Sequence, residues 1–151
     1  MQLCEGALLT RRGKPMTMGN NHGTIILASA SPRRTELMAL AGIEFSAVPA
    51  DICENVLPGE APADHVIRLS REKADAIAAT HDGRFFIGAD TIVVLDGAIL
   101  GKPVDGVDAR RMLSGLSGRD HEVITGFTVF DKISSVHISR SVCTEVTFKR
   151  L

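Results

Sequence analysis

The sequence has few aromatic residues, with six phenylalanines and neither tryptophan nor tyrosine. This supply is too thin for a platform of stacked aromatic side chains that would bind single-stranded nucleic acid. The charges are nearly balanced, with 17 Lys and Arg against 18 Asp and Glu and a formal net charge of −1. This balance argues against a broad DNA-binding face. We therefore expect no nucleic-acid partner, and any anion site must be local.

Cysteines are also scarce, and no apolar run is long. Cys4, Cys53 and Cys143 show neither the CxxC spacing of zinc ligands nor a paired secreted framework, so a reducing cytoplasm is the expected location. The longest apolar run, Leu37 to Ala41, is far shorter than the roughly 20 residues of a membrane span. The motifs GxxxxGK[ST], GxGxxG and GxSxG are absent, which excludes P-loop kinases, Rossmann dehydrogenases and serine hydrolases.

The 151 residues, 44% of them apolar, suit one soluble globular domain. At the start of the chain, Leu8 and Leu9 precede the basic residues, which is the reverse of the order in a signal peptide. Secretion is therefore not indicated. Because Met16 and Met18 come shortly before the first strand-like run, residues 1–23 are predicted to form a flexible N-terminal extension or to reflect an upstream start, with a functional tail as the alternative, and residues 24–151 to form the folded domain.

The domain opens with the pattern of a buried strand, a tight turn and a helix. Residues 24–28 are β-branched and apolar, as in a strand buried on both faces. Ser31 is a candidate N-cap before Pro32, and Gly42 suits the position after the helix. The helical spacing of Leu37, Leu40 and Ala41 predicts that they face the sheet.

Further along the chain, strand and helix patterns alternate. We expect a strand over 44–48, a long polar loop over 49–63, a helix over 62–80, strand segments over 85–88 and 92–95, a hairpin turn at 96–97, a helix over 106–113 capped by Asp105, and strands over 123–130 and 136–148. The apolar face of the second helix is predicted to contain Val66, Leu69, Ala74, Ile77 and Ala78. This order predicts an α/β fold with a mixed sheet.

The first candidate site is Ser29-Ala30-Ser31-Pro32-Arg33-Arg34, where a strand ends at a helix N-terminus. Free backbone N–H groups point at one spot there and attract anions. Two arginines in the first helical turn oppose the helix dipole unless an anion offsets them. The alternative is a solvated helix start with two surface arginines.

Lys73 and Asp90 are the next candidates. Lys73 lies at the edge of the apolar stripe of its helix, from which its ammonium could reach a cleft or simply cover apolar surface. Asp90 follows an apolar strand segment, at the position where open α/β sheets bind ligands. The alternative for Asp90 is a side chain that caps a turn.

Lys102 lies between a glycine and a proline after the hairpin, and Asp51 and Glu54 lie in the long loop. Cations at strand ends can hold a polyphosphate, and carboxylates can hold magnesium and orient water. The histidines show no metal-ligand spacing, so we interpret them as structural: His22, His65, His81, His121 and His137.

Several motifs in order resemble the Maf family of nucleoside triphosphate pyrophosphatases, named for inhibition of septum formation. They are ILASASPRRTELMALAGIEF, the acidic loop with CEN before PGE, SREKA, IGADTIVVLDGAILGKP and LSGRDHEVITGFTV, and they span residues 25–148. The resemblance implies a Maf/ITPase-like α/β fold, with a mixed sheet, flanking helices and a nucleotide cleft.

The resemblance also implies roles for individual residues. Glu54 and Asp90 would hold a divalent cation, Mg²⁺ or Mn²⁺, and Asp90 would also activate water. Triphosphate binding would fall to Ser29, Arg33, Arg34, Lys73 and Lys102. The SPRR form together with ADT marks the branch acting on dTTP and UTP, with Arg33 and Thr91 near the specificity-determining positions.

Family members continue beyond the segment matching Val142 to Phe148, so the domain over 24–151 is expected to be incomplete at its C-terminus. The expected reaction yields a nucleoside monophosphate and pyrophosphate. Two alternatives stay open: a catalytically impaired nucleotide-binding remnant or regulator linked to septum formation, and a pyrophosphatase for modified nucleotides such as methylated GTP. Dimers are common in the family, so a homodimer is the assembly that the resemblance implies.

Overall fold

The structure, a computed structural model, describes residues 24–150. The N-terminal extension predicted over residues 1–23 lies outside the described residues. The described elements are, in chain order, β1 (Ile25–Ala28), α1 (Pro32–Leu40), β2 (Ser46–Val48), α2 (Pro62–Ala78), β3 (Phe85–Leu95), β4 (Ala98–Leu100), α3 (Gly106–Leu116), β5 (Asp120–Asp131) and β6 (Val136–Thr147). The predicted alternation of strands and helices is confirmed.

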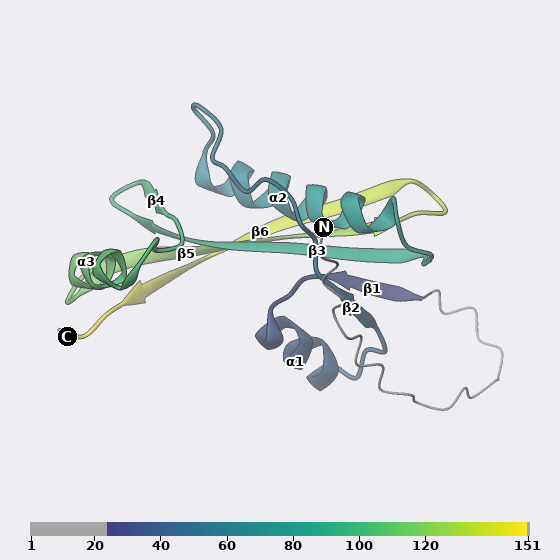
Figure 1. The fold of residues 1–151 in the computed structure, drawn as a ribbon, viewed down its shortest axis with the longest axis horizontal. Helices are drawn as coiled ribbons and strands as arrows, with labels where there is room; N and C mark the ends of the chain where they lie inside the picture. The colour runs from purple at the N-terminus through teal and green to yellow at the C-terminus, as the bar shows by residue number, and fades with distance from the viewer. Residues whose placement is uncertain (1–23, 151) are drawn as a thin grey trace, which may run out of the picture.

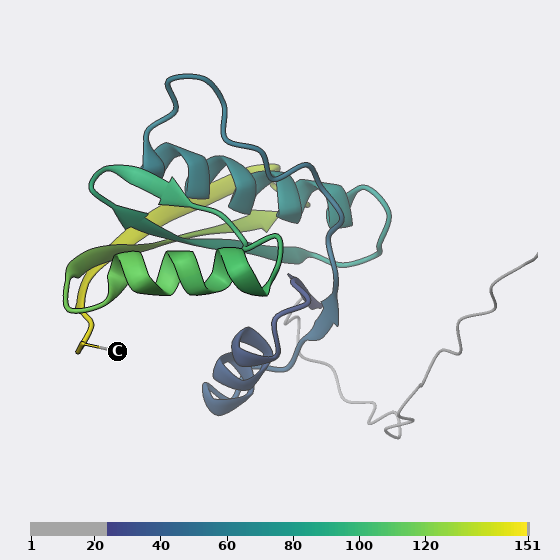
Figure 2. The same cartoon turned by 60° about the vertical axis from the view of Figure 1, so that its left-hand side comes forward.

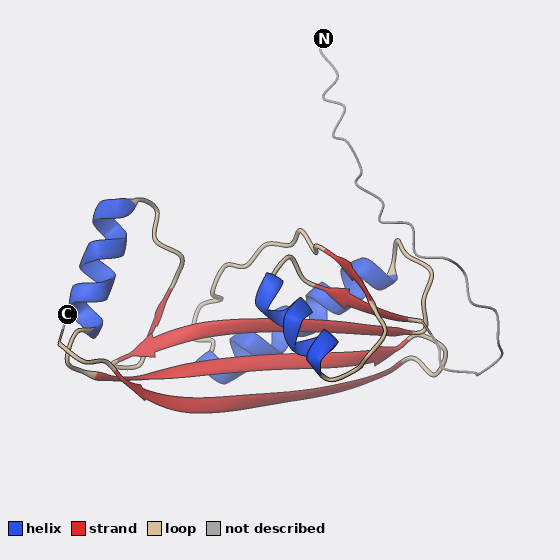
Figure 3. Ribbon diagram, turned by 90° about the horizontal axis from the view of Figure 1, so that it is seen from below, coloured by secondary structure: helices blue, strands red, loops and turns tan. Residues whose placement is uncertain are grey.

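The strands form one mixed sheet, as predicted (Figures 1 and 3). Along the sheet the order is β2-β1-β3-β5-β6, and the short β4 pairs with the far end of β3. The strand β1 runs parallel to both β2 and β3, whereas β5 and β6 complete the sheet by antiparallel pairing. The sheet therefore has a parallel part at its N-terminal strands and a long antiparallel part.

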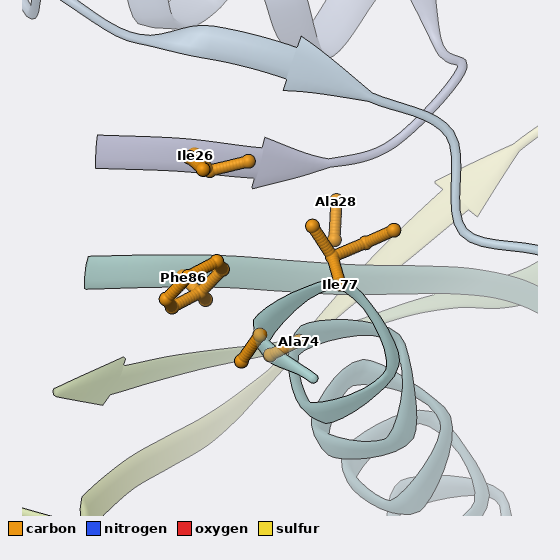
Figure 4. Packing of buried hydrophobic residues seen from close by; sticks show 6 residues of the cluster. Ile26, Ala28, Ala74, Ile77 and Phe86 are labelled. Atoms are coloured by element: carbon orange, nitrogen blue, oxygen red, sulfur yellow. The ribbon is translucent and has the colours of Figure 1, made fainter. Parts of the chain in front are cut away.

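The helix α2 covers one face of the sheet and provides the core (Figure 1). The apolar face predicted for this helix is confirmed, because Val66, Leu69, Ala74, Ile77 and Ala78 are all buried. Figure 4 shows Ala74 and Ile77 of α2 among Ile26, Ala28 and Phe86 of the sheet. Burial of these aliphatic side chains stabilises the fold by roughly 25 cal/mol for each Å² of apolar surface removed from water.

Two glycines let α2 approach the sheet closely. A Cβ atom added at Gly88 of β3 would lie 1.9 Å from the carbonyl oxygen of Ser70, and one added at Gly126 of β5 would lie 2.5 Å from the backbone of Val66. A side chain at either position would therefore displace α2 from the sheet. The glycines thus set the distance between the helix and the middle of the sheet.

The strand β3 differs from its prediction, because it is a single strand of 11 residues rather than two segments. Its neighbour β5 pairs with it continuously from Phe85 to Val94, so the backbone stays extended through the GAD sequence. Its other neighbour, β1, ends opposite Gly88. Asp90 therefore lies within a strand, two residues beyond the end of β1, and the prediction that it follows a strand is wrong.

The helix α1 lies on the side of the sheet opposite α2 (Figures 1 and 2), and it differs from its prediction because none of its residues is buried. Leu37 is 59% exposed and Leu40 84%, and Ala41 is exposed as well. The same sheet side exposes Val136, Ile138 and Val142, which alternate along β6.

The predicted turns and caps are largely confirmed. Asp96 and Gly97 have positive φ values of 51° and 77° and form the hairpin between β3 and β4. Asp105 caps α3 by accepting a hydrogen bond from the Asp108 N–H, and the helix extends to Leu116, three residues beyond its predicted end. Ser31 occupies the N-cap position of α1, but its side chain makes no capping hydrogen bond. None of the described helices is long and apolar enough to cross a membrane.

Candidate active site

An open cleft of about 900 Å³ lies where β1 ends beside β3. Its other walls are α2, the β3–β4 hairpin, the segment after β4 and the Glu54 loop. We define this loop as residues 49–61, and it rises beyond the start of α2 (Figure 2). Seven of the eight predicted site residues line this cleft: Ser29, Arg34, Glu54, Lys73, Asp90, Thr91 and Lys102.

Asp90 and Lys73 form a buried ion pair at the centre of the cleft. The Lys73 Nζ lies 2.7 Å from Asp90 Oδ1, and the two residues are only 7% and 8% exposed. Lys73 lies on α2 beside Ala74, which approaches Gly88, and Asp90 lies two residues beyond Gly88 on β3. Two alternatives are therefore wrong: Lys73 does not extend into solvent over apolar surface, and Asp90 does not cap a turn.

Glu54 joins this pair to Lys102. Its Oε1 lies 2.8 Å from Lys73 Nζ, and its Oε2 accepts a hydrogen bond of 2.8 Å from Lys102 Nζ. Lys102, followed by Lys73, lowers the pKa of Glu54 from its ordinary value of 4.5 to about 2. The same carboxylate raises the pKa of Lys102. Glu54 and Lys102 therefore carry their full charges near neutral pH.

Arg34 connects α1 to the sheet at the edge of the cleft. Its guanidinium donates hydrogen bonds of 2.9 Å to the carbonyl oxygen of Ala89 and 3.0 Å to Thr91 Oγ1, and a longer one of 3.4 Å to Ser29 Oγ. The hydroxyl of Thr91 also lies 3.0 Å from that of Thr125. Arg34 is therefore half-buried and hydrogen-bonded to β3, so it is not a solvated surface arginine.

Two of the sequence candidates lie elsewhere. Arg33 is exposed on α1 and does not line the cleft, although it precedes Arg34 directly. Asp51 is also exposed and does not line the cleft. Adjacent residues on a helix point about 100° apart, so only one of the two arginines can face the end of β1.

Sequence reasoning missed a polar cluster next to the cleft, which we call the Glu60 cluster and which consists of Glu60, His65 and Arg68. Hydrogen bonds from Arg68, together with contacts to His65 and the Leu57 N–H, hold the pKa of the Glu60 carboxyl well below its ordinary value. The i, i+3 spacing of His65 and Arg68 after an acidic residue was the available signal.

The carboxylates of the cleft have the chemistry that a divalent cation requires. Glu54 and Asp90 both lie within 2.8 Å of the same Lys73 ammonium, so one cation already bridges them. Among the described residues no group of three or more His, Cys, Asp or Glu side chains is placed to hold a metal. Two carboxylates nevertheless suffice for Mg²⁺ when substrate phosphates and water supply its other ligands.

The cleft thus combines three Lys and Arg side chains with two carboxylates, under the end of a parallel strand. This combination has the means to bind a polyanion together with a divalent cation. The class defined by the fold and the cleft is therefore an α/β protein with a charged ligand site at the edge of a parallel strand pair.

Comparison with known proteins agrees with this class. Residues 24–151 match the family model described as "Maf-like protein", and the chain belongs to this family. The resemblance found in the sequence motifs is therefore confirmed.

Several curated relatives are closely similar. The chain is 59% identical to a protein of Geobacter metallireducens over 127 residues, which are 84% of this chain and 66% of the relative. It is 57% identical over 129 residues to one from Geobacter sulfurreducens, covering 85% and 68% of the two chains. It is 51% identical over 129 residues to one from Syntrophotalea carbinolica, covering 84% and 59%. All three bear the name "dTTP/UTP pyrophosphatase", and the chain spans about two thirds of the length of such relatives.

Proposed function

We propose that this chain is a metal-dependent nucleoside triphosphate pyrophosphatase that hydrolyses dTTP and UTP to the nucleoside monophosphate and pyrophosphate. The observation that carries the proposal is the buried Lys73–Asp90 pair, joined through Glu54 to Lys102 in one cleft. The names of relatives that are 51–59% identical support the choice of reaction and substrate.

In the proposed reaction, Asp90 is the general base. Its Oδ1 accepts a hydrogen bond from Lys73, whereas its Oδ2 accepts no hydrogen bond from the described residues. Asp90 Oδ2 takes a proton from water as the water oxygen bonds to the α phosphorus. The bond from that phosphorus to the α–β bridging oxygen breaks, and pyrophosphate leaves with the electron pair. Lys73 orients the carboxylate through this hydrogen bond.

The cations of the cleft bind the triphosphate. Lys73, Lys102 and Arg34 can donate to phosphate oxygens, and Ser29 at the end of β1 adds a hydroxyl. Arg33 stays a candidate through the motif alone, since its side chain does not line the cleft.

The resemblance implies a divalent cation, Mg²⁺ or Mn²⁺, and the donor set of the cleft fits one. Glu54 and Asp90 would hold it, and when bound it would neutralise charge on the phosphates. The contacts of both carboxylates with the Lys73 ammonium, at 2.8 and 2.7 Å, support this proposal.

The family resemblance implies that residues near Thr91 determine which nucleotide base is accepted. This residue is exposed on β3 and fixed by hydrogen bonds to Arg34 and Thr125. A cytoplasmic location, a homodimer and the division into an extension and one domain over 24–151 belong to the same proposal. Free, exposed Cys53 and Cys143 suit a reducing compartment.

The test is pyrophosphate release from dTTP, UTP and a panel of other triphosphates, including methylated GTP, with Mg²⁺ or Mn²⁺. We expect release from dTTP and UTP to be fastest and to require the metal. Asp90→Asn should lower turnover by at least about 10²-fold while nucleotide affinity is largely kept, as for a positioned general base.

Asp96→Asn is the matched control. This residue directly follows the same strand, in an exposed turn at φ 51°, a conformation that asparagine tolerates. Its turnover should equal that of the wild-type chain. Unchanged turnover in Asp90→Asn would remove Asp90 from the role of base. Nucleotide binding without turnover in the wild-type chain would favour a nucleotide-binding regulator instead.

A further inference from the structure

The Glu60 cluster lies beside the cleft, at the start of α2, and it has no part in the reaction proposed above. The Glu60 side chain accepts hydrogen bonds from Arg68 Nε at 2.6 Å and Arg68 Nη2 at 2.9 Å, a paired arrangement of two parallel N–H donors. His65 Nδ1 lies 2.9 Å from the same carboxylate. The side chains of Glu60 and His65 are only 8% and 3% exposed.

The cluster holds the backbone of the Glu54 loop at two points. Arg68 Nη2 donates a hydrogen bond of 3.0 Å to the carbonyl oxygen of Asn55, the residue next to Glu54. Glu60 Oε2 accepts one of 3.1 Å from the Leu57 N–H. A helix residue is thereby connected to the loop backbone one residue away from the carboxylate that enters the cleft.

The cleft itself holds Glu54 in a way that substrate would disturb. Among the described residues, Lys73 and Lys102 are the groups that bind its carboxylate. In the proposed function both lysines also bind the triphosphate, so Glu54 must share or lose these partners when the nucleotide enters. Its position then depends on the loop backbone, and hence on the hydrogen bonds from Arg68 and Glu60.

We propose that Arg68 and Glu60 are positioning residues, which fix the Glu54 loop on α2 so that Glu54 stays directed into the cleft while its lysine partners engage the triphosphate. This inference rests on the proposed function. It assigns to the two residues a role in binding the metal–nucleotide complex, although neither of them lines the cleft. Supporting groups of this kind commonly alter metal affinity by about 10- to 100-fold when removed.

A purely structural role for the cluster predicts something different. The N-cap of α2, Ala61, offers no capping side chain, and Glu60 could simply stabilise the first turn of the helix. In that case removing Arg68 would lower the stability of the fold, and ligand binding by the folded protein would not change. The two roles are separated by measuring affinity and stability on the same variants.

The experiment uses calorimetry on the full chain with Mn²⁺ and a UTP analogue whose α–β bridging oxygen is replaced by methylene. Arg68→Met should weaken Mn²⁺ binding in the presence of the analogue by about tenfold. Arg71→Met is the matched control, because Arg71 lies on the exposed side of the same helix and pairs only loosely with Asp75, at 3.9 Å. It should bind like the wild-type chain.

A double-mutant cycle shows whether Arg68 acts through Glu54. In a Glu54→Gln background, Arg68→Met should weaken binding little further, since the carboxylate that it positions is already gone. Amide hydrogen exchange over residues 52–57 should speed up in Arg68→Met and stay unchanged in Arg71→Met. Should Arg68→Met fold poorly in urea titrations, Glu60→Gln replaces it, because glutamine keeps the size but leaves one fewer oxygen to accept the Leu57 N–H.

Binding of Mn²⁺ at wild-type affinity by Arg68→Met and Glu60→Gln overturns the inference. So does a loss of affinity from Arg68→Met that is as large in the Glu54→Gln background as in the wild-type chain. Loop exchange that does not change also overturns it. A wild-type chain that binds no Mn²⁺ and analogue at all counts against the proposed function itself, and the inference falls with it. Because the wild-type result stands apart from the variant results, the two failures are distinguishable.

Discussion

At the scale of single residues, Arg33 and Arg34 show that the side chains of adjacent residues can have very different surroundings. The two are neighbours in the first turn of α1, yet Arg33 is exposed while Arg34 is half-buried and hydrogen-bonded to β3. The SPRR motif alone gives both residues the same role. The structure gives Arg34 the access to the cleft that a phosphate contact requires.

We expect Arg34→Met to weaken triphosphate binding by about 2 kcal/mol, the size of a hydrogen bond to a charged group, and Arg33→Met to cost less than about 1 kcal/mol. The measurement is the affinity for a non-hydrolysable UTP analogue, with a thermal melt to correct for any loss of folding in Arg34→Met. A larger loss in Arg33→Met would restore the assignment that the motif suggests.

The sequence predicts which residues form the site better than how they pair. The motifs identify Asp90, Lys73, Glu54 and Lys102, and all four line one cleft. That Lys73 bridges two carboxylates could not be predicted, because it depends on how closely α2 approaches β3. The Glu60 cluster was missed for a similar reason: its members lie near one another in sequence, but their contact with the loop backbone is tertiary.

At the scale of elements, the contact between α2 and the sheet is set by Gly88 and Gly126. A Cβ atom at Gly88 would meet backbone atoms of Ser70 and Ala74, which cannot rotate away as a flexible side chain could. We therefore expect Gly88→Ala to lower the free energy of unfolding by about 2 kcal/mol or more, because overpacking displaces α2. Urea titration of the ligand-free chain measures this loss.

Gly106→Ala is the control for this prediction. Gly106 is the first residue of α3, it has no positive φ, and an added Cβ there meets nothing within 4 Å. Its stability should stay within about 0.5 kcal/mol of the wild-type chain or rise slightly. Equal losses in both variants would show that the backbone freedom of glycine matters here, and not the approach of α2.

Element types were predicted well because the periodicity of apolar residues is a local property. It specified the buried face of α2, and it also predicted an inward face for α1 that the structure does not show. Periodicity identifies an apolar stripe without identifying what covers it. The continuity of β3 through Asp90 depends on pairing with β5, more than 30 residues later in the chain, which local patterns do not reveal.

At the scale of the whole molecule, several carboxylates are stabilised in their charged form. The pKa of Glu60 is lowered chiefly by Arg68, that of Asp131 by Arg84, and that of Glu54 to about 2 by Lys102 and Lys73. A carboxyl whose pKa is lower in the folded chain stabilises the fold fully above its unfolded value, and this contribution is lost as the pH falls through the folded value.

The ligand-free chain should therefore lose stability as the pH falls below about 4.5, the ordinary value for Glu54 and Glu60. Urea midpoints near pH 7 and near pH 3 measure the difference, with a lower midpoint expected in acid. Asp131→Asn should show a smaller difference, since it removes one of the carboxyls whose pKa is lowered. An acid midpoint equal to the neutral one would contradict these ion pairs.

The position of Asp90 within β3 has a consequence for how the cleft accommodates ligands. Asp90 lies on a strand that is paired over most of its length, and Lys73 lies on a helix seated directly on that strand. Glu54 and Lys102, in contrast, belong to loops. The cleft is therefore half preorganised and half adaptable. When a nucleotide binds, the loops that contain Glu54 and Lys102 must become ordered. The entropy lost by these loops lowers the affinity for the nucleotide, while Asp90 and Lys73 keep their alignment.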